Sequence, residues 1–282
     1  LSDALIEDNS MYIGQDPSST TSTAEYNVSI GTTALDAVTT GDYNTALGYN
    51  SLTANNEGKK NTAVGYASMN SNTSGDLNTA VGHSALEYSA SGEKNTAVGF
   101  EALRVNSVSY YNTGIGTGAL TDANRTADID GYNTALGYNA GNTGTNDVTT
   151  GNKNTLLGAS TAASAAAGSN QSVIGYGATG QADNSVVLGN ADVTAVYMAQ
   201  DKGATVHAAG ADLSGSTGLI LENDETITNS TDGTVLINGI VSGGTGSAAG
   251  VFTSNGDYDV TLQTGNSTTG SITITDGANG NI

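Results

Sequence analysis

The stretch Asn61-Thr62-Ala63-Val64-Gly65 returns, with small changes, many times along this 282-residue chain. Each version ends in an aliphatic residue followed by a glycine. These glycines are Gly14, Gly31, Gly48, Gly65, Gly82, Gly99, Gly116, Gly137, Gly158, Gly175 and Gly189. Their spacing is 17 residues six times in succession, and then 21, 21, 17 and 14. A period this regular predicts one structural unit stacked on copies of itself.

A second apolar column follows four residues after the repeat glycine. Its members are Leu35, Leu52, Met69, Leu86, Leu103 and Leu120. The apolar segments on either side of the glycine have four or five residues, which is too short for helices and typical of strands. Alternation along a strand places the Thr and the aliphatic residue on one face, with Asn and Ala on the other. We expect the Thr and aliphatic face to point inward.

A 17-residue coil has room for two strands and two turns. We therefore expect an all-β fold, a parallel β-roll (β-solenoid) in which each strand pairs with its equivalent one coil on. At ~4.8 Å per coil, ten intervals give a rod roughly 50 Å long. The Ala-rich run 162–167 favours helix by propensity, but its place within a 17-residue interval favours a coil.

The polar turns carry the irregularities of the repeat. Both 21-residue intervals gain their extra residues there, in 121–130 and 142–150. A glycine usually stands three residues before the Asn, where we expect it to supply a positive φ. These turn glycines are Gly41, Gly58, Gly75, Gly92 and Gly151.

Stacked coils place equivalent residues in ladders. We expect aliphatic ladders in the core, and Asn ladders whose amides bond up and down the stack. The ladder residues are Asn44, Asn61, Asn78, Asn95, Asn112, Asn133 and Asn154, with Leu47, Val64, Val81, Val98, Ile115, Leu136 and Leu157. Such a core is only one or two side chains thick, and the small Ala face permits close approach of another rod. We therefore expect an oligomer.

Composition excludes several classes of function. Acidic residues outnumber basic ones 27 to 7, a formal charge of −20, which disfavours nucleic acid and anionic lipid as partners. There is no Cys, which excludes disulfides and thiol catalysis. No apolar run approaches membrane-spanning length, so we expect no membrane insertion.

The sequence offers little for catalysis. No nucleotide-binding loop, nucleophile elbow or zinc-protease motif occurs, and no column supplies the two opposed carboxylates of a glycosidase. His83 shares a column with aromatic residues, and His207 has no identifiable partner. Asp257 and Asp259 lack the spacing of calcium loops. We expect no catalytic residues, no metal, no cofactor and no enzymatic activity.

One outward column is a candidate for recognition. The residue after the repeat glycine is often aromatic, and rings one coil apart suit either stacking on glycans or, as we favour, packing between subunits. These receptor-binding candidates are Tyr49, Tyr66, Phe100, Tyr138 and Tyr176. The residue before each Asn forms another column, which we expect to face solvent. It contains Tyr26, Tyr43, Lys60, Lys94, Tyr111, Tyr132 and Lys153.

The period ends near residue 190. We expect an N-terminal connection at 1–9, the roll at 10–190, a β-hairpin neck at 191–240 built on 196–208, and a β-rich fibrous module at 241–282. Further strands are expected at 234–237, 260–264 and 271–275. The module ends in an unfinished strand pattern, so we expect it to continue beyond the chain.

Two resemblances extend this interpretation. The phrase Asn184-Ser-Val-Val-Leu-Gly189 resembles the repeat of YadA-type trimeric adhesin heads, which implies a left-handed roll and a homotrimer. That family repeats at about fourteen residues, whereas most coils here take 17. The phrase Asn-Thr-Ala-Val/Leu-Gly-Tyr, with 193–206 and 254–265, is similar to tail-fibre and related virion proteins of phages.

These resemblances imply a structural, non-enzymatic segment of a phage tail fibre, exposed on the virion surface. It would serve as rigid spacer and host-attachment surface. Its partners would be other copies of itself, other virion proteins, and a glycan or protein receptor of the host. The alternative is the head domain of a bacterial trimeric cell-surface adhesin, and a polysaccharide depolymerase is a more distant third.

Overall fold

The computed structural model describes residues 4–14, 23–123 and 130–197. The chain divides into a unit of residues 1–205 and a second of residues 206–282. The described residues all belong to the first unit and contain strands and turns but no helix, which confirms the all-β expectation. The expected fibrous module lies outside the described residues. So does the expected neck apart from 191–197, which form neither strand nor helix.

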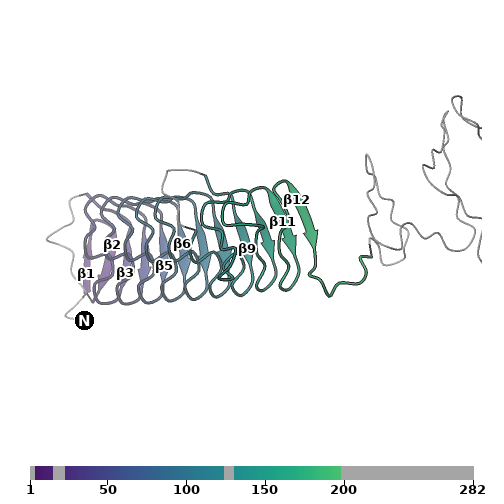
Figure 1. Cartoon of the computed structure of the whole chain (residues 1–282). Helices are drawn as coiled ribbons and strands as arrows, with labels where there is room; N and C mark the ends of the chain where they lie inside the picture. The colour runs from purple at the N-terminus through teal and green to yellow at the C-terminus, as the bar shows by residue number, and fades with distance from the viewer. Residues whose placement is uncertain (1–3, 15–22, 124–129, 198–282) are drawn as a thin grey trace, which may run out of the picture. The chain divides into compact units, whose positions relative to one another are not determined.

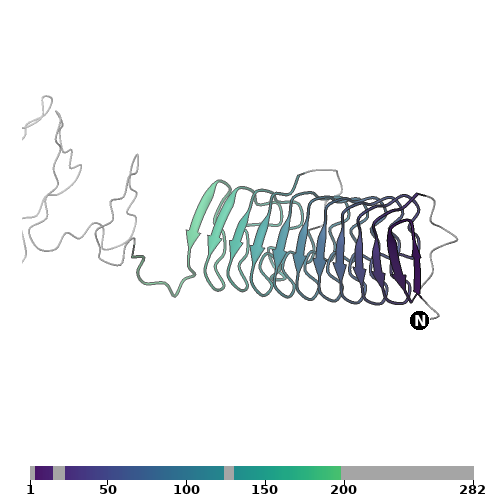
Figure 2. The same ribbon diagram turned by 180° about the vertical axis from the view of Figure 1, so that it is seen from behind.

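One sheet of twelve strands runs in chain order from β1 to β12 (Figures 1 and 2). The strands are β1 (Ala4–Glu7), β2 (Ser10–Ile13), β3 (Val28–Ile30), β4 (Thr45–Leu47), β5 (Thr62–Val64), β6 (Thr79–Val81), β7 (Thr96–Val98), β8 (Thr113–Ile115), β9 (Thr134–Leu136), β10 (Thr155–Leu157), β11 (Gln171–Ile174) and β12 (Ser185–Leu188). From β2 onward every pairing is parallel, as in the expected β-solenoid. β1 pairs antiparallel with β2, so residues 4–7 form a strand rather than the simple connection expected for 1–9.

The register follows the repeat without a slip. Thr62 pairs with Thr79, Ala63 with Ala80 and Val64 with Val81. Across the two 21-residue intervals Thr113 still pairs with Thr134, and Thr134 with Thr155. The extra residues therefore lie in the turns, as predicted. The Ala-rich run 162–167 is likewise part of a coil, and Ala162 bridges to Thr179 of the next coil.

Each coil contains one strand, not the two that we expected. The second apolar column lies in turns because its residues adopt the left-handed conformation, with φ of 49° at Leu52 and 50° at Met69. A left-handed residue cannot continue a strand. These turns nevertheless stack as regularly as the strands do. The Leu52 amide donates to the Ser68 carbonyl at 3.0 Å, and the Met69 amide to the Ala85 carbonyl at 2.9 Å.

The orientation of the strands corrects our expectation. Ala46 and Ala80 are fully buried, whereas the neighbouring Leu47 and Val81 are 45% and 37% exposed. The predicted alternation is confirmed, but the prediction of which face points inward is wrong, since Thr and the aliphatic residue face outward. The outward aliphatic residues, exposed or partly so, are Leu47, Val64, Val81, Val98, Ile115, Leu136 and Leu157.

The thickness of a 17-residue coil explains this inversion. The interior already holds the fully buried Leu column of the turns, from Leu35 to Leu120. The space opposite is small: a Cβ added at Gly114 would lie 3.1 Å from Cγ of Leu103. A strand residue that faces this column must therefore be small, as Ala46, Gly114 and the buried Ser29 are, and larger aliphatic residues are left outside.

Near Gly141 the large core residue moves from the turn side of the coil to the strand side. The Leu column ends at Gly141, and the strand side then carries Leu156, which is 1% exposed. A Cβ at Gly141 would lie 2.7 Å from Cδ2 of Leu120 and 2.9 Å from Cδ1 of Leu156. A large residue on the strand therefore replaces a large residue in the turn, which keeps the interior filled.

The expected Asn ladder is present and buried from Asn44 to Asn154. The Asn61 amide donates to Oδ1 of Asn44 at 3.0 Å, and Nδ2 of Asn61 donates to the Gly75 carbonyl at 2.8 Å. Oδ1 of Asn61 in turn accepts from the Asn78 amide at 2.9 Å, so each Asn side chain satisfies backbone groups of the following coil. A second buried polar column, which we did not predict, contains Asn55, Asn72, Ser89 and Asn106.

The turn glycines serve a different purpose from the one expected. Their φ angles are not in the positive range; instead, a Cβ at Gly58 would lie 2.6 Å from the carbonyl oxygen of Gly75. Glycine is required there because the neighbouring coil comes too close. The repeat glycines meet both demands: Gly65 has a φ of +135°, and a Cβ would lie 2.7 Å from the Gly82 carbonyl carbon.

Candidate functional site

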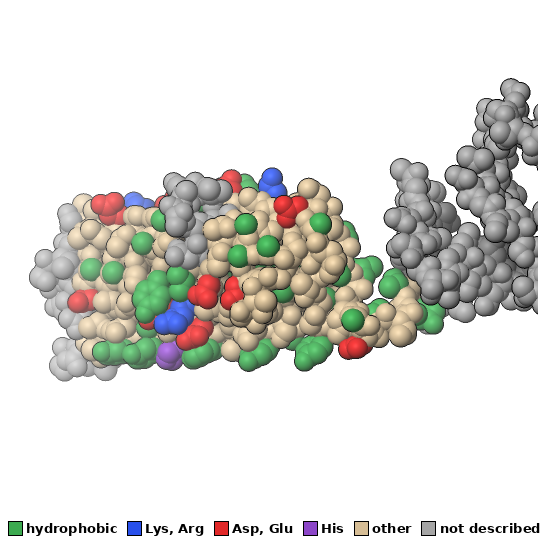
Figure 3. Space-filling model, viewed as in Figure 1, with side chains coloured by type: hydrophobic (Ala, Val, Ile, Leu, Met, Phe, Trp, Pro, Cys, Tyr) green, Lys and Arg blue, Asp and Glu red, His purple; other side chains and the backbone are tan. Residues whose placement is uncertain are grey.

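The most distinctive surface of the roll is the edge at which the strands end. In Figure 1 the arrows of the parallel strands point to the lower edge of the roll, where each coil turns at its repeat glycine. The next residue projects outward from this edge. Figure 3 shows a row of green side chains there, with a histidine among them. We call this column the aromatic edge, and it consists of Tyr49, Tyr66, His83, Phe100, Thr117, Tyr138, Ala159 and Tyr176.

Four successive rings of the aromatic edge stack on one another. The ring centroids are 5.5 Å apart for Tyr49 and Tyr66, 4.7 Å for Tyr66 and His83, and 5.3 Å for His83 and Phe100. The first two pairs are close to parallel, with interplanar angles of 21° and 19°. The ring faces inside this ladder are therefore occupied by neighbouring rings, and only the ring edges remain for solvent or a partner.

This stacking clarifies two sequence hypotheses. His83 is a variant of the structural column, as proposed, because it lies between Tyr66 and Phe100 as one more ring of the stack. His207 lies outside the described residues. Face-on contact of a glycan with the inner rings of the ladder is blocked, because the rings pack against each other within one chain.

The ladder is interrupted twice after Phe100. Thr117 and Ala159 take the positions on either side of Tyr138, and Ala159 also precedes Tyr176. Tyr138 is 59% exposed and Tyr176 75% exposed, against 50% for Tyr49 and Tyr66. Within the described part of the chain, neither tyrosine has a stacked aromatic partner. The five receptor-binding candidates thus divide into stacked and unstacked rings.

The column before each Asn faces solvent, as predicted. Its residues are left-handed, with φ of 59° at Tyr43, 56° at Lys94 and 59° at Tyr111. The Tyr26 and Tyr43 rings stack with centroids 4.9 Å apart, and so do the Tyr111 and Tyr132 rings. Nζ of Lys94 lies 3.1 Å from the Tyr111 hydroxyl, and this hydrogen bond raises the pKa of the Lys94 ammonium.

Charged side chains pair between coils. Nζ of Lys59 lies 2.9 Å from Oδ2 of Asp42, and Nε of Arg104 lies 2.9 Å from Oε2 of Glu87. Partial burial tends to raise the pKa of Asp42, but hydrogen bonds from Lys59 and from the backbone amide of Glu25 outweigh it, and the net pKa is lowered. Nη1 of Arg104 also lies 3.6 Å from Oε1 of Glu101, so two carboxylates share one guanidinium on the surface of the roll.

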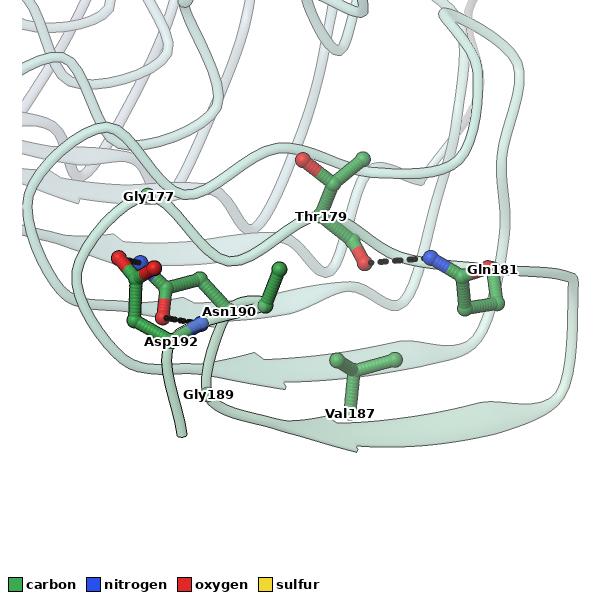
Figure 4. Close-up of a pocket in the computed structure, with 8 residues that line it drawn as sticks. Gly177, Thr179, Gln181, Val187, Gly189, Asn190 and Asp192 are labelled. Atoms are coloured by element: carbon green, nitrogen blue, oxygen red, sulfur yellow. Dashed lines mark hydrogen bonds between the residues drawn. The ribbon is translucent and has the colours of Figure 1, made fainter. Parts of the chain in front are cut away.

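A hollow of about 560 Å³ lies near β11 and β12, at the C-terminal end of the roll (Figure 4). Val187, Gly177 and Thr179 line it together with the turn at Asn190 to Asp192. The Asp192 amide donates to Oδ1 of Asn190 at 3.0 Å, which fixes that turn. Asp192 is the one acid among the described lining residues. One carboxylate does not make the acid and base pair of a glycosidase.

Two further kinds of feature are absent from the described residues. Residues 4–14, 23–123 and 130–197 contain no group of three or more His, Cys, Asp or Glu side chains that could hold a metal ion. Nor do these residues include a helix with the length and apolarity needed to span a bilayer. Asp257 and Asp259 lie outside them. Comparisons with family models, curated proteins and solved structures find no match.

Proposed function

We propose that this chain is a structural, non-enzymatic segment of a virion fibre, a rigid spacer that also presents a host-attachment surface. The observation that carries the proposal is the outward face of the sheet. There, Thr and aliphatic ladders form a continuous apolar strip along a rod whose interior is already filled. A soluble rod with a strip of this kind is suited to packing against other rods.

Other copies of the same chain are the natural partners for this strip. Identical coils have identical spacing, so rods aligned in parallel can match ladder to ladder along their whole length. Closed symmetry would cover the strip on every rod, and the resemblance to trimeric adhesin heads favours a homotrimer. The Ala face, which we first considered for this contact, is buried inside each coil and cannot supply it.

The phage assignment rests on sequence phrases, and the adhesin head remains the second candidate. Both place the rod outside a cell, on a virion surface in one case and on a bacterial surface in the other. Both expect a glycan or protein receptor, and the first also expects other virion proteins as partners. Neighbouring tail genes would support the fibre, whereas a downstream membrane-anchor domain would support the adhesin.

The interface can be tested by placing charge on the strip. We expect Leu47→Asp, Val81→Asp and Leu136→Asp, combined in one chain, to convert a trimer into monomers, because each of the three positions would bury three mutually repelling carboxylates, one from each copy. The measurement is mass by light scattering, with circular dichroism as the check on folding. The matched control carries Asn56→Asp, Ser74→Asp and Ala166→Asp, which add the same charge at exposed turns.

The control should keep the wild-type mass. A wild-type protein that is monomeric over the whole accessible concentration range would count against the fibre interface. Release of reducing sugar from host polysaccharide would contradict the non-enzymatic role and favour the depolymerase.

A further inference from the structure

The interruptions of the aromatic edge lie in an unbroken backbone stack. The Gly118 amide donates to the Phe100 carbonyl at 2.9 Å, and the Asn139 amide to the Thr117 carbonyl at 2.8 Å. The Ser160 amide donates to the Tyr138 carbonyl at 2.8 Å, and the Gly177 amide to the Ala159 carbonyl at 2.9 Å. Thr117 and Ala159 therefore hold true positions of the column, at which only the ring is missing.

The spacing of the stack sets the size of each gap. Neighbouring rings in the intact ladder have centroids 4.7 to 5.5 Å apart. Phe100 and Tyr138 are two coils apart, as are Tyr138 and Tyr176, so each pair of rings is separated by roughly 10 Å. A single ring placed midway would lie about 5 Å from both neighbours, which is a favourable distance for stacked rings.

We propose that each gap takes one pyranose ring of a neutral host-surface glycan, held between the faces of two aromatic side chains. This assignment rests on the attachment role proposed above and names the ligand class for it. A pyranose has faces of C–H groups, which the negative face of an aromatic ring attracts. Its rim carries hydroxyl groups that suit a polar environment, and the half-buried Asn139 and Ser160 follow Tyr138 and Ala159 directly in the chain.

The negative charge of the protein favours a neutral ring-shaped ligand over an anionic one. A formal charge of −20 disfavours nucleotides and acidic sugars, whose anionic groups would approach an acidic surface. A neutral sugar carries no such penalty. Tyr138 borders both gaps and is therefore the central residue of the site. Two sugar rings of one glycan can stack on its opposite faces.

The sharpest test completes the ladder. Thr117→Tyr and Ala159→Tyr, made together in the full chain, place a ring in each gap, as the protein itself does at Tyr49 and Tyr66. We expect the melting temperature to be retained and glycan affinity to fall about tenfold or more, which corresponds to about 1.4 kcal/mol, because both gaps lose the stacking contacts with the sugar. Tyr138→Ala, which removes the shared wall, should give a similar loss.

Thr32→Tyr is the matched control. It introduces the same side chain in the same column beyond Tyr49, where it extends the ladder and fills neither gap, so binding should be unchanged. The probes are neutral oligosaccharides of glucose, galactose, mannose and N-acetylglucosamine, and binding is measured by saturation-transfer NMR and tyrosine fluorescence.

Two results would overturn the assignment. One is equal binding of sugars by the wild type and the ladder-completing variant. The other is a wild type that binds none of the probes, including the case in which an aromatic peptide binds instead. Neither result alters the light-scattering test, so failure of the glycan site and failure of the fibre interface are distinguishable.

Discussion

At the scale of single residues, the volume available inside the coil decides which side chains are buried. Ala63 and Ala80 are completely buried, although valine is the more hydrophobic residue and stands beside each of them. The reason is that Leu52, Met69 and the equivalent turn residues already fill the interior. Hydrophobicity alone would favour Val at the inward position. The short distance between the strand and the turn residues leaves room only for a side chain as small as Ala.

Substituting two adjacent residues in the same way tests this orientation. Ala80→Val adds volume to a filled core and should lower the free energy of unfolding by about 1–3 kcal/mol. Thr79→Val is nearly the same shape on the outer face, and should change the free energy by no more than about 0.5 kcal/mol. Guanidinium denaturation of both full-length variants gives the comparison. A larger loss for Thr79→Val would reverse the assignment of the faces.

The sequence could predict the period, the alternation and the parallel register, because each follows from residue spacing. It could not predict the sense of the alternation in the same way, since a strand with period two has two equivalent faces. The signal lay in the constancy of small residues at one position, Ala46 to Gly114, beside freely exchanged Leu, Val and Ile. For the aromatic edge, spacing predicted an outward column and the sequence shows that Thr117 and Ala159 carry no ring, but only geometry reveals that four rings cover each other.

At the scale of one coil, stability comes from contacts between neighbours in the stack. The buried Asn ladder, the strand hydrogen bonds and the stacked turns all join residues one coil apart. Charged pairs such as Lys59 with Asp42 use the same spacing on the surface. They add to a lattice of backbone bonds that is already complete, so each is worth little by itself.

The Asp42 pair predicts a specific dependence on pH. The pKa of Asp42 is below its usual 3.8, so the folded protein binds the proton less readily than the unfolded chain does. The pair therefore stabilises the fold above about pH 4, and its contribution is lost as the pH falls through the lowered pKa. We expect Asp42→Asn to reduce the melting temperature by about 1–2 °C at pH 7, and by less as the pH approaches 3.

Thermal melts of the wild type and Asp42→Asn between pH 3 and pH 7 measure this difference. Glu57→Gln, an exposed substitution in the adjacent turn, is the control and should give a difference that does not follow the same course. A gap between wild type and Asp42→Asn that widens towards low pH would contradict the pairing.

At the scale of the whole roll, the two ends differ. β1 pairs antiparallel with β2, and the fully buried Tyr12 of β2 fills the interior of the first coil. At the other end β12 has a parallel neighbour on one side only, and Val186 is 66% exposed. Exposed strand edges are sites where further chain can pair. Both ends of the roll therefore present an edge strand: β1, which is antiparallel to its neighbour and carries Ile6 79% exposed, and β12, which is parallel to its neighbour.

Because each coil contacts only its neighbours, the roll should tolerate the loss of one entire coil. Deleting residues 61–77 joins Lys60 to Asn78 and brings the Asn78 amide to Oδ1 of Asn44, which is the contact that Asn61 now makes at 3.0 Å. We expect this chain to fold, to unfold cooperatively, and to show a smaller denaturant slope because less surface is exposed. Deleting only residues 61–68 removes the strand and glycine but leaves the turn. That variant should lose cooperative unfolding, and equal behaviour of the two deletions would show that the 17-residue coil is not the folding unit.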